Sequence, residues 1–112
     1  MNFLECDWRD GAAIQGVAVS TASTQAPATT SLTVGIRPEY LEVHDAAGAN
    51  RIPARIVAVR DQGTHTMVQL DIGSRLAWSR VRNTRRALQP GPAFVYLPAD
   101  KCALYADDRR LP

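Results

Sequence analysis

Alternating apolar and polar positions dominate this chain, and the pattern predicts β-strands. In a strand, successive side chains point to opposite faces, so a period of two separates a core-facing side from a solvent-facing side. Segment 76–81 alternates in this way, while 52–59 becomes apolar on both faces, as in a strand that enters a core. The strictest alternation lies at 66–72, where one face carries Thr66, Val68, Leu70 and Ile72 and the other carries Met67, Gln69 and Asp71.

Turn-forming residues separate these segments. Asp61-Gln62-Gly63 and Gly73-Ser74 interrupt the alternation, so 52–81 is predicted to be a three-stranded meander. Asp10-Gly11 lies between the apolar segments 3–9 and 13–19. Because Asp-Gly supplies the positive φ that a tight turn needs, these two segments are predicted to pair as a hairpin.

The rest of the chain adds short strands and almost no helix. Segment 20–30 has no periodicity and is predicted to be a flexible loop, and 83–88 is the only plausible helical turn. Residues 1–112 are therefore predicted to form one all-β domain, an OB-like Greek-key barrel of short antiparallel strands with at most one helical turn. The further strands are expected at 32–36, 41–44, 94–97 and 102–106.

Composition agrees with a small soluble domain. A chain of 112 residues has material for one core, or for a core divided between two small barrels. Its net charge of +2 is not the strongly basic balance of a nucleic-acid-binding protein, so no nucleic acid is expected as a partner. No run approaches the ~18 apolar residues of a membrane span, and Glu5 and Asp7 follow too closely on Met1 for a signal peptide. The expected location is the cytoplasm.

The search for catalytic chemistry is negative. The sequence has no Gly-x-x-x-x-Gly-Lys-Ser/Thr loop, so nothing is predicted to cradle a nucleotide phosphate. His44 and His65 are too isolated for a metal site or a catalytic triad, and His65 is expected to be solvated or hydrogen-bonded in a turn. Cys6 and Cys102 lie at opposite ends of the chain and are interpreted as buried thiols. The chain is therefore predicted to be no enzyme and to hold no cofactor or metal.

Two short motifs are more specific than this background. In Val34-Gly35-Ile36-Arg37-Pro38-Glu39, Pro38 lacks an N–H and forces Arg37 into an extended conformation, so a strand must end there. Arg37 and Glu39 flank the break and are interpreted as a local ion pair or cap at the corner. The second motif is the turn Gly63-Thr64-His65-Thr66, about two dozen residues later.

Together these motifs resemble the C-terminal regulatory (TOBE) domain of the ATP-binding subunits of ABC importers for sugars and glycerol phosphate, the family of the maltose-importer ATPase. That family carries a Gly-Ile-Arg-Pro-Glu strand end and then a hairpin turn of the Gly-Thr/Ser-x-Thr type. The sequence departs from the family pattern at Tyr40, where His is frequent, and at Gln62, where an apolar residue is usual. The matching positions here are Gly35, Arg37, Pro38, Glu39, Gly63, Thr64 and Thr66.

The resemblance implies a non-catalytic regulatory and dimerisation domain. The chain would follow an ATPase domain that uses Mg-ATP, and it would itself need no cofactor. Its expected partners are a second copy, the ATPase domain, the membrane subunits of the importer and a regulatory protein. The domain would then lie at the inner face of the cell membrane, held there through the transporter.

The segment 75–86 is the candidate interaction surface. Its arginines are interpreted as a docking face for an acidic partner or a phosphate-bearing ligand, or else as a solvated loop. Trp78 would stack on a base, or pack against the barrel or a partner subunit, and a symmetric dimer that buries it is expected. The alternative function is a free-standing OB module that binds single-stranded nucleic acid or a small oxyanion such as molybdate. The surface comprises Arg75, Trp78, Arg80, Arg82, Arg85 and Arg86.

Overall fold

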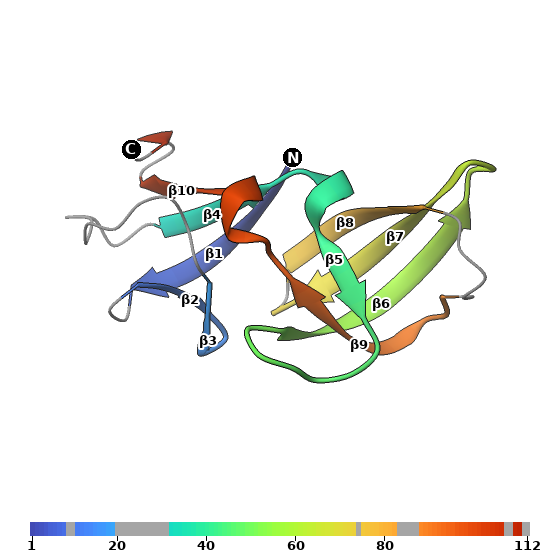
Figure 1. Cartoon of the computed structure of the whole chain (residues 1–112), viewed down its shortest axis with the longest axis horizontal. Helices are drawn as coiled ribbons and strands as arrows, with labels where there is room; N and C mark the ends of the chain where they lie inside the picture. Colours follow the sequence, from blue (N-terminus) through green and yellow to red (C-terminus); the bar gives the residue numbers. More distant parts are fainter. Residues whose placement is uncertain (9–10, 20–31, 74, 83–87, 107–108, 111–112) are drawn as a thin grey trace.

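The computed structural model describes residues 1–8, 11–19, 32–73, 75–82, 88–106 and 109–110, which form two antiparallel sheets side by side (Figure 1). One sheet has six strands in the order β11-β10-β4-β1-β2-β3, and the other has five in the order β5-β9-β6-β7-β8. The elements are β1 (Asn2–Trp8), β2 (Ala12–Ile14), β3 (Val17–Ala18), β4 (Leu32–Ile36), η1 (Pro38–Tyr40), β5 (Glu42–His44), β6 (Ile52–Asp61), β7 (His65–Ile72), β8 (Arg75–Arg82), β9 (Gly91–Tyr96), η2 (Ala99–Lys101), β10 (Cys102–Ala106) and β11 (Arg109–Arg110).

The five-stranded sheet is inserted between two neighbouring strands of the six-stranded sheet. Strands β5 to β9 all lie between β4 and β10 in the sequence, yet β4 and β10 pair directly. Their register joins Cys102 to Ile36, Leu104 to Val34 and Ala106 to Leu32. The chain therefore leaves the six-stranded sheet at the end of β4, builds the second sheet, and returns to the strand that it left.

The five-stranded sheet curls until its two edge strands, β5 and β8, approach each other. Ser79 in β8 is fully buried, and its hydroxyl donates a hydrogen bond to the carbonyl oxygen of Leu41, one residue before β5. This contact draws the edges of the sheet together and gives the partly closed barrel of an OB-like fold. The prediction of an all-β, OB-like architecture is confirmed.

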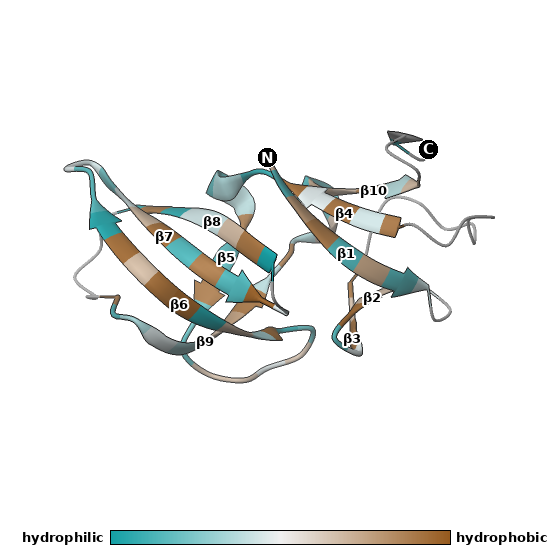
Figure 2. Cartoon of the chain, turned by 180° about the vertical axis from the view of Figure 1, so that it is seen from behind, coloured by the Kyte–Doolittle hydropathy of each residue, from teal (hydrophilic) through white to brown (hydrophobic). Residues whose placement is uncertain are grey.

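A single apolar core joins the two sheets. The alternation predicted for β7 is confirmed, because Val68, Leu70 and Ile72 are buried while the intervening residues are partly exposed. Alternating apolar and polar bands along β6 and β7 are visible in Figure 2. Because strands of both sheets supply the core, neither sheet buries its apolar face alone. Its most deeply buried members include Leu4, Val34, Ile36, Ile52, Val68, Leu70, Val95 and Leu104.

A β-bulge corrects the interpretation of 52–59 as apolar on both faces. Ile56 pairs with Leu70, but Ala58 pairs with Gln69, so Val57 is the extra residue that no residue of β7 opposes. Val57 is 48% exposed. A bulge inserts one residue and resets the alternation, which returns Val59 to the core side opposite Val68.

Two turns differ from the sequence-based expectation. The segment 13–19 is not one strand, because Gln15 and Gly16 have positive φ values of 52° and 78° and reverse the chain between β2 and β3. Two 3-10 turns, η1 and η2, follow Arg37 and Pro98. Proline at the first position of η1 fixes φ near its helical value, whereas Pro98 is the residue before η2. The predicted loop at 20–30 and nearly all of the helical turn expected at 83–88 lie outside the described residues.

The side chain of Asn2 takes the place of a strand at the edge of the barrel. Its amide nitrogen donates to the carbonyl oxygen of Trp78 at 2.7 Å, and its Oδ1 accepts from the backbone N–H of Trp78 at 2.8 Å. Asn2 is only 7% exposed. The edge of β8 is therefore paired at this residue by a side chain of β1, which ties the six-stranded sheet to the barrel.

Two weaker polar contacts lie across the same junction. Arg75 in β8 donates to Glu5 in β1 at 2.6 Å, and Gln15 donates to the carbonyl oxygen of Pro53 in β6 at 3.3 Å. Both contacts are exposed. Exposed pairs add about 0 to 1 kcal/mol, so the buried core and the Asn2 amide are the main connection between the sheets.

Replacement of Asn2 by alanine is expected to lower the free energy of unfolding by about 2 kcal/mol, because both backbone groups of Trp78 lose their partner in a partly buried place. Chemical denaturation followed by circular dichroism measures this loss. Gln15→Ala is the matched control, since it removes an exposed amide contact and should cost less than about 0.5 kcal/mol. Equal losses in the two variants would contradict the role assigned to Asn2.

Candidate functional site

Gly35 lies where two aromatic rings meet across β4. Phe3 in β1 and Tyr105 in β10 contact each other edge to face over this residue, with ring centroids 5.4 Å apart. A Cβ atom on Gly35 would lie 2.8 Å from the ring of Tyr105 and 3.2 Å from that of Phe3. Glycine is therefore needed at this position because the aromatic rings approach the backbone closely.

The Arg37-Pro38-Glu39 corner starts the path into the barrel. Arg37 is extended, as predicted for a residue before proline, and Pro38 opens η1. The expected ion pair or cap between Arg37 and Glu39 is wrong: within the described part of the chain no hydrogen bond or ion pair joins them, and both are exposed or partly exposed. Proline geometry alone is sufficient for this corner, so the charged side chains are not required to hold it.

The Gly63-Thr64-Thr66 motif forms the tight connection between β6 and β7. Gly63 has a φ of 93°, and its backbone N–H donates to the side chain of Asp61 at 2.8 Å. His65 lies 3.2 Å from the hydroxyl of Thr64, which agrees with the hydrogen-bonded turn residue expected. Thr66 already belongs to β7 and pairs with Asp61. This motif shapes a hairpin and converges on no pocket.

The structure separates the arginines of 75–86. Arg75 is at the junction of the sheets and is paired with Glu5. Arg80 and Arg82 are exposed on the outer face of β8, on the same side as Trp78. Arg85 and Arg86 lie outside the described residues. Among the described arginines of this segment, Arg75 is therefore separated from Arg80 and Arg82.

The register brings two further arginines of β6, which sequence reasoning missed, to the same outer face as Arg80, on the other side of β7. In the ladders of the sheet, Met67 of β7 lies between Arg60 of β6 and Arg80 of β8. In the same way, Asp71 of β7 lies between Arg55 of β6 and Leu76 of β8. We call this surface the arginine face. Its members on β6, β7 and β8 are Arg55, Val57, Arg60, Met67, Asp71, Leu76, Trp78, Arg80 and Arg82.

Trp78 is partly exposed in the middle of the arginine face. The guanidinium carbon of Arg60 lies 5.9 Å from its ring centroid, within the range of a cation–π contact. The backbone of Trp78 is held by Asn2 on the other side. The indole of Trp78 therefore does not pack inside the barrel, because it lies on the outer surface. It is also not an open platform for stacking, because the guanidinium of Arg60 lies beside it.

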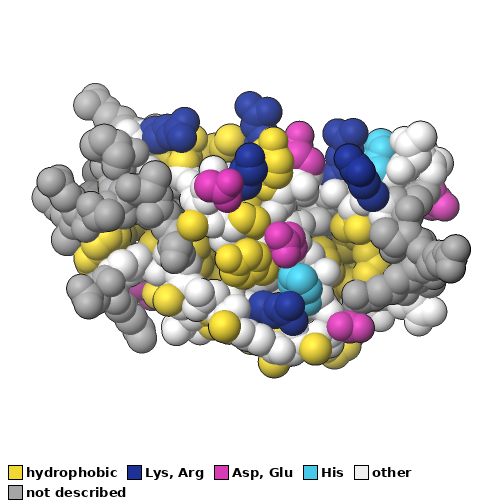
Figure 3. All heavy atoms as spheres, viewed as in Figure 1, with side chains coloured by type: hydrophobic (Ala, Val, Ile, Leu, Met, Phe, Trp, Pro, Cys, Tyr) yellow, Lys and Arg dark blue, Asp and Glu magenta, His cyan; other side chains and the backbone are white. Residues whose placement is uncertain are grey.

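The opposite side of the barrel has a different character. Figure 3 is viewed from the side of β5 and β9, and Lys and Arg side chains are interspersed there with Asp and Glu. His44 and Glu42 form one such pair at 3.0 Å. Interspersed charges of both signs are typical of an ordinary solvated surface.

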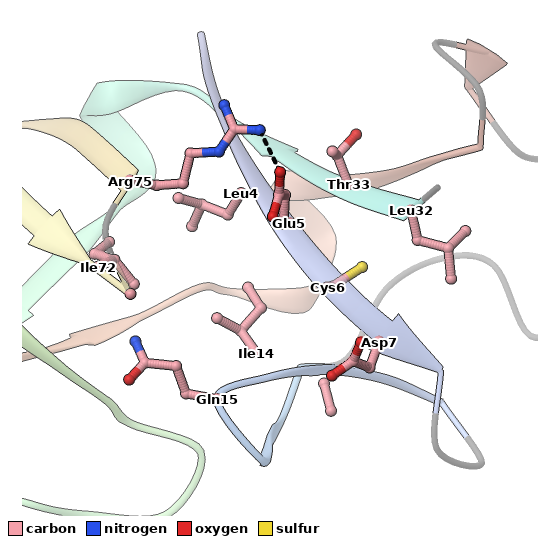
Figure 4. A pocket seen from close by; sticks show the side chains of 12 residues that line it. Leu4, Glu5, Cys6, Asp7, Ile14, Gln15, Leu32, Thr33, Ile72 and Arg75 are labelled. Atoms are coloured by element: carbon pink, nitrogen blue, oxygen red, sulfur yellow. Dashed lines mark hydrogen bonds and ion pairs between the residues drawn. The ribbon is translucent and has the colours of Figure 1, made fainter. Parts of the chain in front are cut away.

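A groove of about 590 Å³ lies between β1, β2 and the end of β7. Glu5, Asp7 and Arg75 are its charged residues, and Figure 4 shows the guanidinium of Arg75 turned toward Glu5. Because Arg75 is already paired with Glu5 and Asp7 adds a second carboxylate, the net charge of the groove is negative. Such a groove repels an oxyanion such as molybdate or phosphate.

The family model described as the TOBE domain matches residues 34–104. The chain belongs to the TOBE domain family. A search of curated proteins finds no match. TOBE domains are small OB-like domains found in ABC transporter ATPases and in molybdate-binding proteins.

The bounds of the TOBE match coincide with the closing point of the fold. Val34 begins the match, Leu104 ends it, and these two residues pair with each other in the ladder of β4 and β10. The TOBE match therefore contains β5 to β9, the end of β4 and the start of β10. Strand β1, which supplies Asn2, lies outside the match.

The described residues of the TOBE domain contain no group of three or more His, Cys, Asp and Glu side chains that could hold a metal ion, and no described helix is long and apolar enough to cross a membrane. Both cysteines are free thiols. Cys6 lines the groove, where burial, with a smaller effect of the Asp7 charge, raises its pKa to about 11. Burial also raises the pKa of the Cys102 thiol.

The thiol of Cys6 is expected to react slowly, because the thiolate is the nucleophile. In a Cys102→Ala background, the alkylation rate with iodoacetamide should keep rising until the pH reaches about 11. Folding favours the protonated thiol, so its contribution to stability is complete below pH 9.0 and is lost as the pH rises toward about 11. A rate that levels off near pH 9, as for the unfolded chain in urea, would contradict this assignment.

Proposed function

We propose that this TOBE domain is the non-catalytic regulatory and dimerisation domain of the ATP-binding subunit of an ABC importer for sugars, glycerol phosphate or a related small solute. The observation that carries the proposal is the family match over residues 34–104, together with the Gly35-to-Glu39 strand end at the entrance to the barrel. The ATPase domain, which would use Mg-ATP, precedes this domain in the proposed subunit. The domain would then be a cytoplasmic one, held at the inner face of the membrane by the transporter.

The charges argue against one alternative, a free-standing oxyanion-binding module. Such a module needs donors that converge on the anion, whereas the main groove carries Glu5 and Asp7. The second alternative, binding of single-stranded nucleic acid, has one supporting observation, the indole of Trp78 among arginines. The net charge of +2 gives this alternative little long-range attraction.

A dimer was expected to bury the surface around Trp78, but we propose that it forms through another surface. A symmetric dimer pairs the same surface of both copies, so burial of Trp78 would bring Arg60 and Arg80 of each copy together. The patch of Phe3, Tyr105 and Met1 suits self-association better. Phe3 is 47% and Met1 59% exposed, and the two aromatic rings already form a fixed pair on the outside of the six-stranded sheet.

Association is tested by sedimentation of the 112-residue chain at increasing concentration. A monomer–dimer equilibrium is expected, and Phe3→Glu should raise the dimer dissociation constant at least about tenfold by placing a charge in the apolar contact. Leu76→Glu is the matched control, because Leu76 is 62% exposed on the arginine face. Dissociation by Leu76→Glu but not by Phe3→Glu would assign the dimer contact to the other surface.

The isolated chain is expected to bind no nucleotide, because the sequence has no phosphate-cradling loop. Calorimetric titration with Mg-ATP should give no heat beyond dilution, and micromolar binding would contradict the proposal. The importer assignment has its own test in the genomic DNA upstream of the Met1 codon. A Walker motif and an ABC signature in frame would support it, and an unrelated reading frame or a stop codon would overturn it.

A further inference from the structure

We propose that the arginine face is a docking surface for an extended acidic segment of a partner protein, one that carries large apolar residues next to its acidic ones. The face is the outer surface of β6, β7 and β8, which lie in front of β5 and β9 in Figure 2. The inference goes beyond the importer role and does not depend on it. It is carried by charge, by the order of residues along β8, and by the shape of the surface.

Charge is concentrated on this face although the whole chain is nearly neutral. Four arginines and one aspartate give the face a charge of +3, so the remaining residues together carry −1 against the net +2 of the chain. Asp71 lies at one end of the face, opposite Arg55 in the ladder of β6 and β7. The other end, around Arg60, Arg80 and Arg82, has no acidic side chain on the outward positions of β7 and β8. This end attracts carboxylates.

The order of side chains along β8 divides the face into two halves. Leu76 and Trp78 lie on the outward side of one half, and Arg80 and Arg82 follow on the same side of the other. Outward residues two apart in a strand are separated by roughly 7 Å, which is also the spacing of alternate side chains in an extended peptide. A peptide with alternate carboxylates can therefore meet both guanidinium groups while its next residues contact Trp78 and Leu76.

The shape of the face selects an extended ligand. Neither the groove of about 590 Å³ nor a smaller one of about 210 Å³ near His44 is lined by a residue of the arginine face. A small anion needs a concave site with converging donors, whereas this outer sheet surface spreads its cations over β6 and β8, with β7 between them. A polypeptide segment spans such a distance, and one phosphate does not.

The apolar side chains favour a polypeptide over a nucleic acid. Single-stranded nucleic acid is bound by several aromatic platforms on which successive bases stack. The described residues of this face carry one aromatic ring, that of Trp78, and Arg60 already lies against it. The other apolar groups are the aliphatic side chains of Val57, Met67 and Leu76, which match leucine or phenylalanine side chains of a partner.

The test uses the 112-residue chain and a fluorescein-labelled peptide of about twelve residues, with alternate glutamates in its first half and leucine and phenylalanine in its second. Fluorescence anisotropy should give saturable binding that weakens with added salt. A peptide with glutamine in place of glutamate should bind at least about tenfold more weakly. Absence of saturable binding, or equal binding of the two peptides, would overturn the proposal.

Matched charge reversals locate the site. Arg80→Glu should weaken binding at least about tenfold, whereas Arg37→Glu, an exposed reversal outside β6, β7 and β8, should change it less than about twofold. Arg82→Glu is the second variant if Arg80→Glu does not fold, as judged by circular dichroism. Equal effects of Arg37→Glu and Arg80→Glu would overturn the site. Tighter binding of oligothymidylate than of the peptide, lost in Arg80→Glu, would assign the face to nucleic acid instead.

Discussion

The pairing of β4 with β10 is the constraint on which the rest of the structure depends. It joins Val34 to Leu104, about seventy residues apart, and so closes the segment that forms the barrel. Bringing such distant segments together costs chain entropy that local pairing does not cost, and burial of the apolar residues of both strands offsets it. This ladder brings Tyr105 to one side of β4, and the ladder of β1 with β4 places Phe3 on the other, so the aromatic pair over Gly35 needs the closure.

Closure leaves the edge of β8 beside β1, and the two sheets meet there through a side chain. The amide of Asn2 satisfies both backbone groups of Trp78, which fixes this residue from behind while its ring lies on the outer face. The junction therefore links the N-terminal strand to the arginine face. A change at Asn2 would alter the support of Trp78 without touching the surface that a partner contacts.

The two outer surfaces of the molecule suit different kinds of association. The side chains of Met1, Phe3 and Tyr105 form an apolar patch that can contact a copy of itself in a symmetric pairing. The arginine face carries a net positive charge, so a copy of itself is an unfavourable partner and an acidic segment a favourable one. A domain with both surfaces can pair with itself and remain free to contact a second protein.

The sequence by itself determined the strands and turns, because these depend on neighbours along the chain. Period-two alternation located β7 and β8, Pro38 ended β4, and Gly63 marked a hairpin. Alternation could not reveal the bulge at Val57, since that residue is extra only relative to its partner strand. The sequence also revealed only part of the arginine face, because cross-strand neighbours cannot be read from alternation along one strand. Arg80 and Arg82 lie on one strand, but only cross-strand register places Arg60 near Arg80 and Arg55 on the same face. Only the packing of β8 against β1 brings Arg75 to Glu5 instead.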